Sequence, residues 1–348
     1  MKYLRYLLIF IPISITLRLL GVDAVWIFFS SAFAIIPLAG ILGKATEEIS
    51  VYTGPRVGGL LNATFGNATE LIISFFALKD GLFDVVKASI AGSVIGNILL
   101  VLGASMLAGG IKYKTQKFNR NAVEVTSSML LFAVIGLSIP AIFTHTVKPD
   151  LLNKSGYESL SIGIACLMII IYIFSLFFSF YTHKDLYGTV HEEAAESKWS
   201  LKKSIIMVLG ATGLIAFMSE LLVSSVEPMT EHIGISKFFI GIILIPIIGN
   251  AAEHSTAILM AVKNKMDIAV EIALGSSLQI ILFVAPVLIF ISLLFTPMSI
   301  VFNEFELVSL IVAVIIANKV SSDGESNWLE GLQLIAVYAI IALSFLIL

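Results

Sequence analysis

One short motif occurs twice in this chain, and each copy places an acidic residue within an apolar stretch. Residues 66–71 are Gly-Asn-Ala-Thr-Glu-Leu, and residues 249–254 are Gly-Asn-Ala-Ala-Glu-His. The second copy begins 183 residues after the first, and the same offset relates Gly92 to Gly275. A charged side chain at the centre of a membrane costs about 2.5–3.5 kcal/mol on insertion scales, so it is rarely retained without a function. The repeat therefore predicts a duplicated membrane fold with a paired acidic site.

The composition places this duplicated chain in a membrane. It is 58% hydrophobic and 13% charged, whereas soluble domains are about 25% charged. Because a spanning helix needs about 20 apolar residues, the sequence predicts an all-α membrane protein. The eleven predicted spans cover residues 3–20, 24–50, 57–79, 84–109, 120–143, 157–182, 201–228, 236–262, 267–295, 301–319 and 328–348.

Lysine and arginine predict the orientation of these spans. With the N-terminus in the cytoplasm, 15 of the 21 Lys and Arg residues fall in segments on the inside, as the positive-inside rule expects. The C-terminus then lies outside. Arg18 interrupts the first apolar run and no small-residue cleavage site follows it. Residues 1–20 are therefore expected to be a membrane helix rather than a cleaved signal peptide.

The order of the spans predicts two inverted repeats. Each copy holds five spans, and because five is odd the second copy enters the membrane from the opposite side. The two acids are then expected to meet at mid-depth. Gly-Ser pairs at 92–93 and 275–276 are expected sites for a kink. The predicted parts are an N-terminal helix, the first repeat, an acidic cytoplasmic linker and the second repeat, at residues 1–23, 24–182, 183–200 and 201–348.

The motif carries the ligands of a hard cation. Asn67 and Glu70 are three residues apart and share one helix face, and Gly66 permits a local break that frees backbone carbonyls. Carboxylate, amide and carbonyl oxygens suit Ca²⁺, which takes six to eight such ligands. Two carboxylates balance one divalent cation. The second copy supplies Gly249, Asn250 and Glu253. The alternative is that the acids only bridge helices inside a bundle.

Further polar residues are candidates for a supporting shell or an access path. His254 follows Glu253, and Leu71 stands at its position in the first copy. His254 either tunes the protonation of Glu253, faces a polar cavity or is a hydrogen-bonded core residue. The remaining candidates are neutral oxygens at equivalent depth and acids at or near helix ends, for which a water-facing end is the alternative. They are Ser93, Asn97, Ser276, Gln279, Glu48, Glu220 and Glu227.

The long polar stretch 183–200 is either a solvated connector or an acidic segment that attracts cations through Glu192, Glu193 and Glu196.

The sequence contains no metalloprotease, nucleophile-elbow, Walker A or dinucleotide signature, so we expect no enzyme activity and no cofactor. The sequence has no basic patch with interleaved aromatic residues, so it gives no indication of nucleic-acid binding. The expected partner is the lipid bilayer, and a homo-oligomer is compatible with the sequence.

These motifs resemble those of the Ca²⁺/H⁺ antiporters of the cation/proton exchanger family, within the wider cation/Ca²⁺ exchanger superfamily. The resemblance covers essentially the whole chain. It rests on residues 66–70 and 249–254, and it is strengthened by the Gly-Ser stretch 92–103, by Gly-Ser-Ser-Leu-Gln at 275–279 and by Ser-Glu-Leu-Leu-Val at 219–223.

The resemblance implies eleven helices, with the first outside two inverted halves, and Glu70 and Glu253 as a site shared by Ca²⁺ and H⁺. The chain lacks the long N-terminal extension of the vacuolar members, which favours a bacterial plasma-membrane protein. The alternatives are a Na⁺-driven exchanger and a passive cation channel. The Na⁺-driven branch carries Ser and Pro beside its acids, whereas here Asn-Ala precedes Thr69-Glu70 and Ala252-Glu253.

Overall fold

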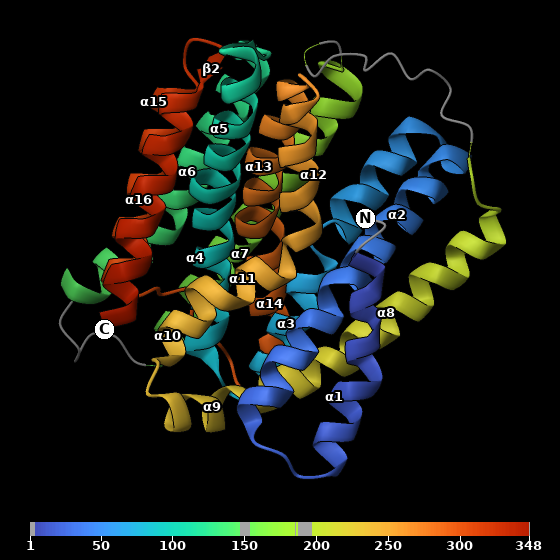
Figure 1. Ribbon diagram of the computed structural model, residues 1–348. Helices are drawn as coiled ribbons and strands as arrows, with labels where there is room; N and C mark the ends of the chain where they lie inside the picture. The colour runs from blue at the N-terminus through green and yellow to red at the C-terminus, as the bar shows by residue number, and fades with distance from the viewer. Residues whose placement is uncertain (1–3, 147–153, 185, 187–196, 348) are drawn as a thin grey trace. The chain divides into compact units, whose positions relative to one another are not determined.

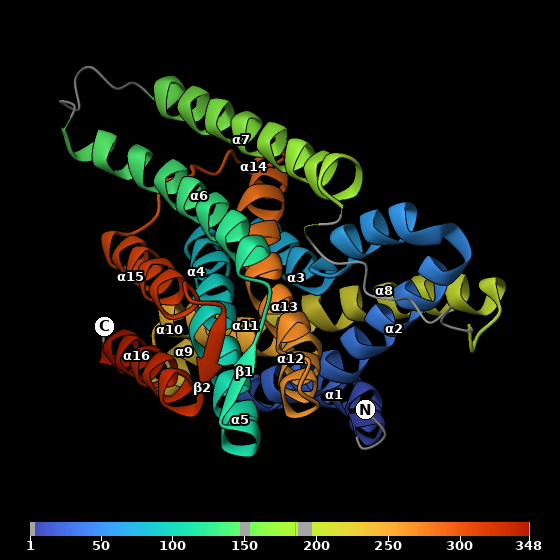
Figure 2. The ribbon, with the colours of Figure 1, turned by 90° about the horizontal axis from the view of Figure 1, so that it is seen from above.

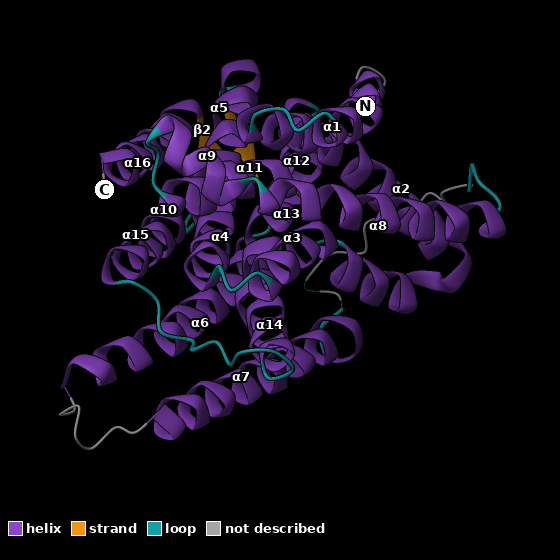
Figure 3. Ribbon diagram, turned by 90° about the horizontal axis from the view of Figure 1, so that it is seen from below, coloured by secondary structure: helices purple, strands orange, loops and turns teal. Residues whose placement is uncertain are grey.

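The computed structural model describes residues 4–146, 154–184, 186 and 197–347, and these residues are almost entirely helical (Figure 3). They form two compact units. The first holds the described residues up to Val86 and from Ser197 to Glu253, and the second holds the rest up to Ile347. Each unit thus takes segments from both halves of the chain. The linker acids Glu192, Glu193 and Glu196 lie outside the described residues.

The first unit is built on two long helices, α2 (Ala24–Phe65) and α8 (Leu201–Ser224), which pack along each other (Figure 1). Asp23 caps the start of α2 by accepting a hydrogen bond from the backbone N–H of Val25 at 2.9 Å. The other elements of this unit are a 3₁₀ helix (Leu4–Ile9), α1 (Phe10–Leu19), α3 (Ala68–Lys79), α9 (Val226–Ile233), α10 (Lys237–Phe239), a π-helical segment (Ile240–Leu244) and α11 (Ile245–Gly249).

The repeated motif breaks the helix in both copies, as the glycine predicted. In the first copy α2 ends before Gly66, Asn67 is non-helical, and α3 follows. In the second copy Asn250 separates α11 from α12 (Ala251–Val262), and the chain bends there by 61°. α2 has an additional kink at Gly54, whose φ of 80° is accessible to glycine at little cost.

The second unit contains a close helix pair and a pair of long neighbouring helices. α5 (Leu102–Tyr113) packs on α16 (Trp328–Ile347) through glycines, since a Cβ at Gly331 would overlap the backbone of Leu107. α6 (Arg120–Thr146) and α7 (Lys154–Phe177) lie beside each other (Figure 2). The other elements are α4 (Phe83–Ile95), α13 (Met266–Gln279), α14 (Ala285–Ser292), α15 (Glu304–Val320) and π-helical segments at Gly96–Val101, Phe178–Thr182 and Ile280–Val284.

Two short strands support the end of α12 in this unit. β1 (Thr115–Lys117) pairs antiparallel with β2 (Glu325–Asn327), with Gln116 opposite Ser326. The buried Gln116 donates hydrogen bonds to the carbonyl of Ala261 and to Asn264 Oδ1, each at 2.9 Å. The carbonyl of Ala261 also accepts from the backbone N–H of Asn264 at 3.0 Å, so the Gln116 side chain adds to the hydrogen bonds at the end of α12.

The expected kinks at the Gly-Ser pairs are displaced. α4 runs without a break through Gly92 to Ile95, and the π-helical segment Gly96–Val101 follows. α13 likewise continues past Gly275 and is followed by Ile280–Val284. A π-helical turn accommodates an extra residue without ending the helix, so both copies have the irregularity about one turn later than expected.

Helices occupy all eleven apolar segments of the sequence. By length and composition, seven helices among the described residues are sufficient to cross a membrane, and a bent pair at Lys237–Val262 raises the number to eight. α15 has 17 residues and is therefore shorter than the roughly 20 residues that a spanning helix needs. The chain is therefore an integral multi-pass membrane protein, while the number of eleven crossings stays a prediction.

Candidate cation site

The acid of the first motif lies against the second motif. Glu70 occupies the first turn of α3 and is only 4% exposed. A Cβ placed on Gly249, the last residue of α11, would lie 3.0 Å from Glu70 Oε1 and 3.3 Å from its Cγ and Cδ. Only glycine at this position lets the carboxylate approach so closely. The two motifs, far apart in the sequence, therefore meet inside the first unit.

The acid of the second motif completes a pair. Glu253 stands in the first turn of α12, as Glu70 does in α3. The positive end of a helix dipole favours a carboxylate at this position. The two carboxylates are close enough for electrostatic repulsion. Glu70 is buried whereas Glu253 is half-buried, so the pair has one sheltered and one more accessible member.

The side-chain amide groups of both motifs are buried, and each belongs to the asparagine three residues before the acid. Asn67 is 2% exposed and Asn250 is 1% exposed. Asn250 Nδ2 donates to the carbonyl of Pro246 at 3.0 Å, which fixes the orientation of the side-chain amide. Among the described residues, Glu70 Oε2 is buried and accepts no hydrogen bond. A buried carboxylate oxygen of this kind, beside a second acid, fits a hard cation that prefers oxygen ligands.

In the second unit, the structure joins two of the predicted supporting residues. His254 Nε2 lies 3.0 Å from Asn97 Oδ1, and Asn97 is 1% exposed in the π-helical segment that follows α4. Ser93 in α4 and Ser276 in α13 are also buried, while Gln279 at the end of α13 is half-buried. His254 thus has a side-chain hydrogen bond, which the bonded-core alternative predicted and which leaves a tuning role open to test.

The predicted access-path acids have different surroundings. Glu220 is exposed on α8. Glu48 in α2 is 7% exposed and accepts hydrogen bonds from residues 197–199. Glu227 is exposed, forms an ion pair with Lys237 and lines a pocket. These three acids therefore do not form one cluster.

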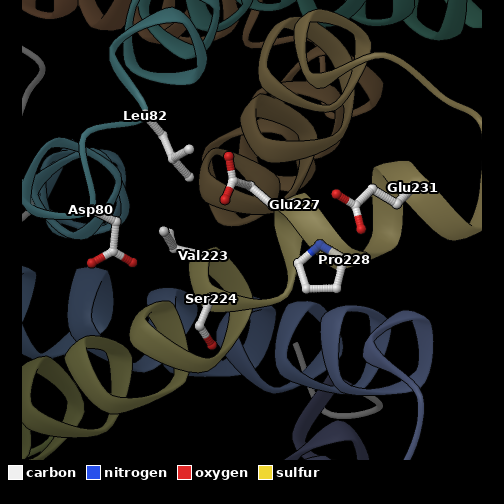
Figure 4. Close-up of a pocket in the computed structure, with 7 residues that line it drawn as sticks. All are labelled: Asp80, Leu82, Val223, Ser224, Glu227, Pro228 and Glu231. Atoms are coloured by element: carbon white, nitrogen blue, oxygen red, sulfur yellow. The ribbon is translucent and has the colours of Figure 1, made fainter.

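The pocket at Glu227 contains two acids that the sequence reasoning missed. Asp80, Glu227 and Glu231 line a pocket of about 470 Å³ in the first unit, together with Leu82, Val223, Ser224 and Pro228 (Figure 4). Asp80 follows the end of α3, and Glu231 is four residues after Glu227 on α9. Glu227 and Glu231 are four residues apart and so share one helix face. This spacing is the feature of the sequence that could have indicated Glu231.

Comparison with known proteins gives a consistent result over the whole chain. The sequence pattern of the sodium/calcium exchanger protein family matches residues 23–181 and 203–347. A protein of Aphanothece halophytica named Ca²⁺/H⁺ antiporter is 47% identical over 97% of this chain and 95% of its own length. The Ca²⁺/H⁺ antiporter ChaA of Bacillus subtilis is 46% identical over 97% of both chains.

Solved structures agree with the sequence comparison. The structure of native YfkE matches with a TM-score of 0.87 at 43% identity, covering 99% of this chain and all of the other. The structure of the H⁺/Ca²⁺ exchanger CAX matches with a TM-score of 0.73 over 99% of this chain and 92% of the other. Because its identity is only 13%, this second match bears on the fold alone.

Proposed function

Because the chain belongs to the sodium/calcium exchanger protein family, we propose that it exchanges Ca²⁺ for H⁺ across a membrane and exports Ca²⁺ when the proton gradient is directed inward. The curated relatives named Ca²⁺/H⁺ antiporters, identical at 44–47% over nearly the whole chain, support this choice of ions. The protein is a transporter and not an enzyme. Ca²⁺ and H⁺ are its cargo, and it needs no cofactor.

One observation of the structure carries the proposal. Glu70 lies against Gly249, so the acids of both motifs contribute to one place in the first unit. We assign Glu70 and Glu253 as the carboxylates that Ca²⁺ and protons share. Asn67, Asn250 and the backbone at Gly66 and Gly249 are the proposed oxygen donors beside them. Ser93, Asn97, His254, Ser276 and Gln279 are proposed as supporting or path-lining groups.

The chemistry of the proposed exchange is competition at this acid pair. When both carboxylates are ionised their repulsion is relieved by one Ca²⁺, which balances both charges. After Ca²⁺ leaves, repulsion in apolar surroundings favours protonation of the pair, which titrates as a unit. Two unpaired carboxylates at membrane depth are costly. The protein is therefore expected to switch rarely between its two access states while the site is empty and ionised. This restriction couples the Ca²⁺ flux to the H⁺ flux.

The proposed architecture has eleven spans, with an N-terminal helix at 1–23 and inverted repeats at 24–182 and 201–348. The N-terminus is placed in the cytoplasm and the C-terminus outside, in a bacterial plasma membrane. The matching helix breaks at Asn67 and Asn250 support two equivalent halves. In this orientation the acidic pocket at Glu227 belongs to the outer side and contributes to ion access, while Glu192, Glu193 and Glu196 belong to the cytoplasmic linker.

The driving ion can be tested directly in proteoliposomes. An imposed pH gradient in Na⁺-free medium should drive Ca²⁺ uptake against its gradient, recorded with an entrapped Ca²⁺ indicator, because the proposed site exchanges Ca²⁺ only for protons. Collapsing the pH gradient with a protonophore is the control. Uptake that requires Na⁺ would place the chain with the Na⁺-driven exchangers, and Ca²⁺ movement only down its own gradient would indicate a channel.

The proposed orientation predicts which side of the membrane two exposed positions face. In a Cys166→Ser background, a thiol introduced by Lys202→Cys should react with an impermeant maleimide only from the cytoplasmic side. One introduced by Thr296→Cys should react only from outside. Both side chains are exposed in the structure, so lack of access does not prevent labelling. Labelling of both from one side would contradict the odd number of spans between them.

A further inference from the structure

Glu48 makes an unusual set of contacts for an acid near a helix end. Its Oε2 accepts hydrogen bonds from the backbone N–H of Lys198 at 2.8 Å and of Trp199 at 3.0 Å, and Ser197 Oγ lies at 3.1 Å. The residue is only 7% exposed. Hydrogen bonds from two consecutive backbone N–H groups to a carboxylate are charge-assisted and directional. Glu48 therefore binds the backbone of the segment that immediately precedes α8.

Neighbouring turns of α2 take part in the same contact. Tyr52 Oη donates to the carbonyl of Trp199 at 2.6 Å. Two ammonium groups lie near the indole of Trp199, Lys44 Nζ at 5.1 Å and Lys203 Nζ at 4.7 Å from the ring centroid. Lys44, Glu48 and Tyr52 are spaced by four and so share one face of α2. We call these three residues, with residues 197–199 and Lys203, the Glu48 contact.

The position of the Glu48 contact gives it mechanical importance. It lies shortly before Gly54, where α2 kinks, and the chain beyond the kink leads to Gly66 and Glu70. On the other side it ends at Ser200, which caps α8 by accepting from the backbone N–H of Lys203 at 3.3 Å. The contact therefore connects the turn of α2 before the kink to the first turn of α8, within one compact unit.

We propose that Glu48 is a positioning residue that keeps the start of α8 attached to α2 throughout the exchange cycle, so that the two helices move as one body. This inference rests on the proposed exchange of Ca²⁺ for H⁺. It replaces the expectation that Glu48 lines the ion path, because its Oε2 is engaged by backbone and hydroxyl donors rather than exposed to an ion. Loss of the contact is expected to slow the conformational step and to leave ion binding intact.

The first test separates rate from affinity in proteoliposomes. Glu48→Ala should lower the maximal exchange rate about tenfold, the effect of losing hydrogen bonds worth about 1.4 kcal/mol in total. The Ca²⁺ concentration at half-maximal rate should stay within about twofold of the wild-type value, since the proposed cation site is untouched. Glu47→Ala is the matched control, because the adjacent Glu47 is exposed, and its exchange should equal that of wild type.

A second test examines whether the contact stays closed. In a Cys166→Ser background, Tyr52→Cys and Ser197→Cys introduce a thiol on each side, and a short bifunctional thiol reagent joins them. The joined protein should exchange at least as fast as the unjoined one, which lacks the hydroxyl groups of Tyr52 and Ser197. Joining should also restore exchange when Glu48→Ala is added. Loss of exchange on joining would mean that the contact opens during the cycle, which overturns the proposal. Failure to restore the rate would overturn it as well.

The outcomes distinguish this inference from the proposed function. If wild-type vesicles show no exchange of Ca²⁺ for H⁺, the proposed function fails before Glu48 is considered. If wild type exchanges and Glu48→Ala matches it, only the positioning role fails. Should Glu48→Ala not be recovered as folded protein, Glu48→Gln decides. Glutamine keeps the size of the side chain but removes the negative charge that strengthens its hydrogen bonds to the backbone N–H groups of Lys198 and Trp199, and an unchanged maximal rate would contradict the proposal.

Discussion

Glu70→Gln is expected to abolish exchange, and Glu253→Gln is expected to do the same, while both variants insert and fold. Glutamine keeps the size and one oxygen atom of the side chain but removes the ionisable group that Ca²⁺ and H⁺ share in the proposed site. Removing one charged partner from a buried ion pair costs about 3–5 kcal/mol. Loss of one carboxylate from the Ca²⁺-bound site should therefore lower Ca²⁺ affinity by about 100-fold or more. Ca²⁺ flux under an imposed pH gradient, with Ca²⁺ binding measured by titration calorimetry, checks this expectation.

The matched control for these variants is Glu47→Gln, which neutralises an exposed acid of α2 rather than an acid of the pair. Its Ca²⁺ flux at saturating Ca²⁺ should remain close to that of wild type. The double variant of Glu70 and Glu253 should be no worse than either single one, since groups that act as a unit are not additive. Wild-type flux in either single variant would show that the acid pair is not the shared site.

Gly249→Ala is expected to weaken apparent Ca²⁺ affinity about tenfold, because small misplacements at a binding centre have large effects. The added methyl group would lie 3.0 Å from Glu70 Oε1. The carboxylate must then shift by a few tenths of an ångström, away from its place beside the second motif. Because Gly249 is helical and its φ is ordinary, the change acts on the site rather than on the backbone.

The control for this prediction is Gly275→Ala, whose added methyl group would meet no heavy atom within 4 Å. This variant should keep the wild-type Ca²⁺ dependence of exchange. Thermal unfolding of both variants in detergent tests whether the fold is intact. A Gly249→Ala protein with unchanged Ca²⁺ affinity would indicate that Glu70 does not need its position against Gly249, and would weaken its assignment as a cation ligand.

The fold class and the acid pair could be predicted because their cause is local in the sequence. An apolar run long enough to cross a membrane is recognisable without tertiary contacts. A charge kept within such a run indicates a functional site in any fold, because its burial is costly everywhere in the hydrocarbon. The breaks at Asn67 and Asn250 were predictable for a similar reason, since the glycine before each asparagine weakens the helix at that point.

The surroundings of the other polar residues depended on distant segments. The sequence placed Glu48, Glu220 and Glu227 in one class of acids near helix ends, and the structure separates all three. Glu48 accepts hydrogen bonds from residues about 150 positions away, and Glu227 shares a pocket with Asp80. The partners of a helix-end acid are determined by which loop passes over it. No periodicity within its own helix carries that information.

The sequence by itself determined that this chain is a helical membrane protein with two acidic motifs, because hydropathy and buried charge act on each segment independently. Only the tertiary structure decided that Glu70 lies against Gly249, that His254 bonds to Asn97 and that Glu48 accepts a hydrogen bond from the segment before α8. These contacts join residues that are far apart in the chain. Their geometry follows from how whole helices pack, a property that no single segment of the sequence contains.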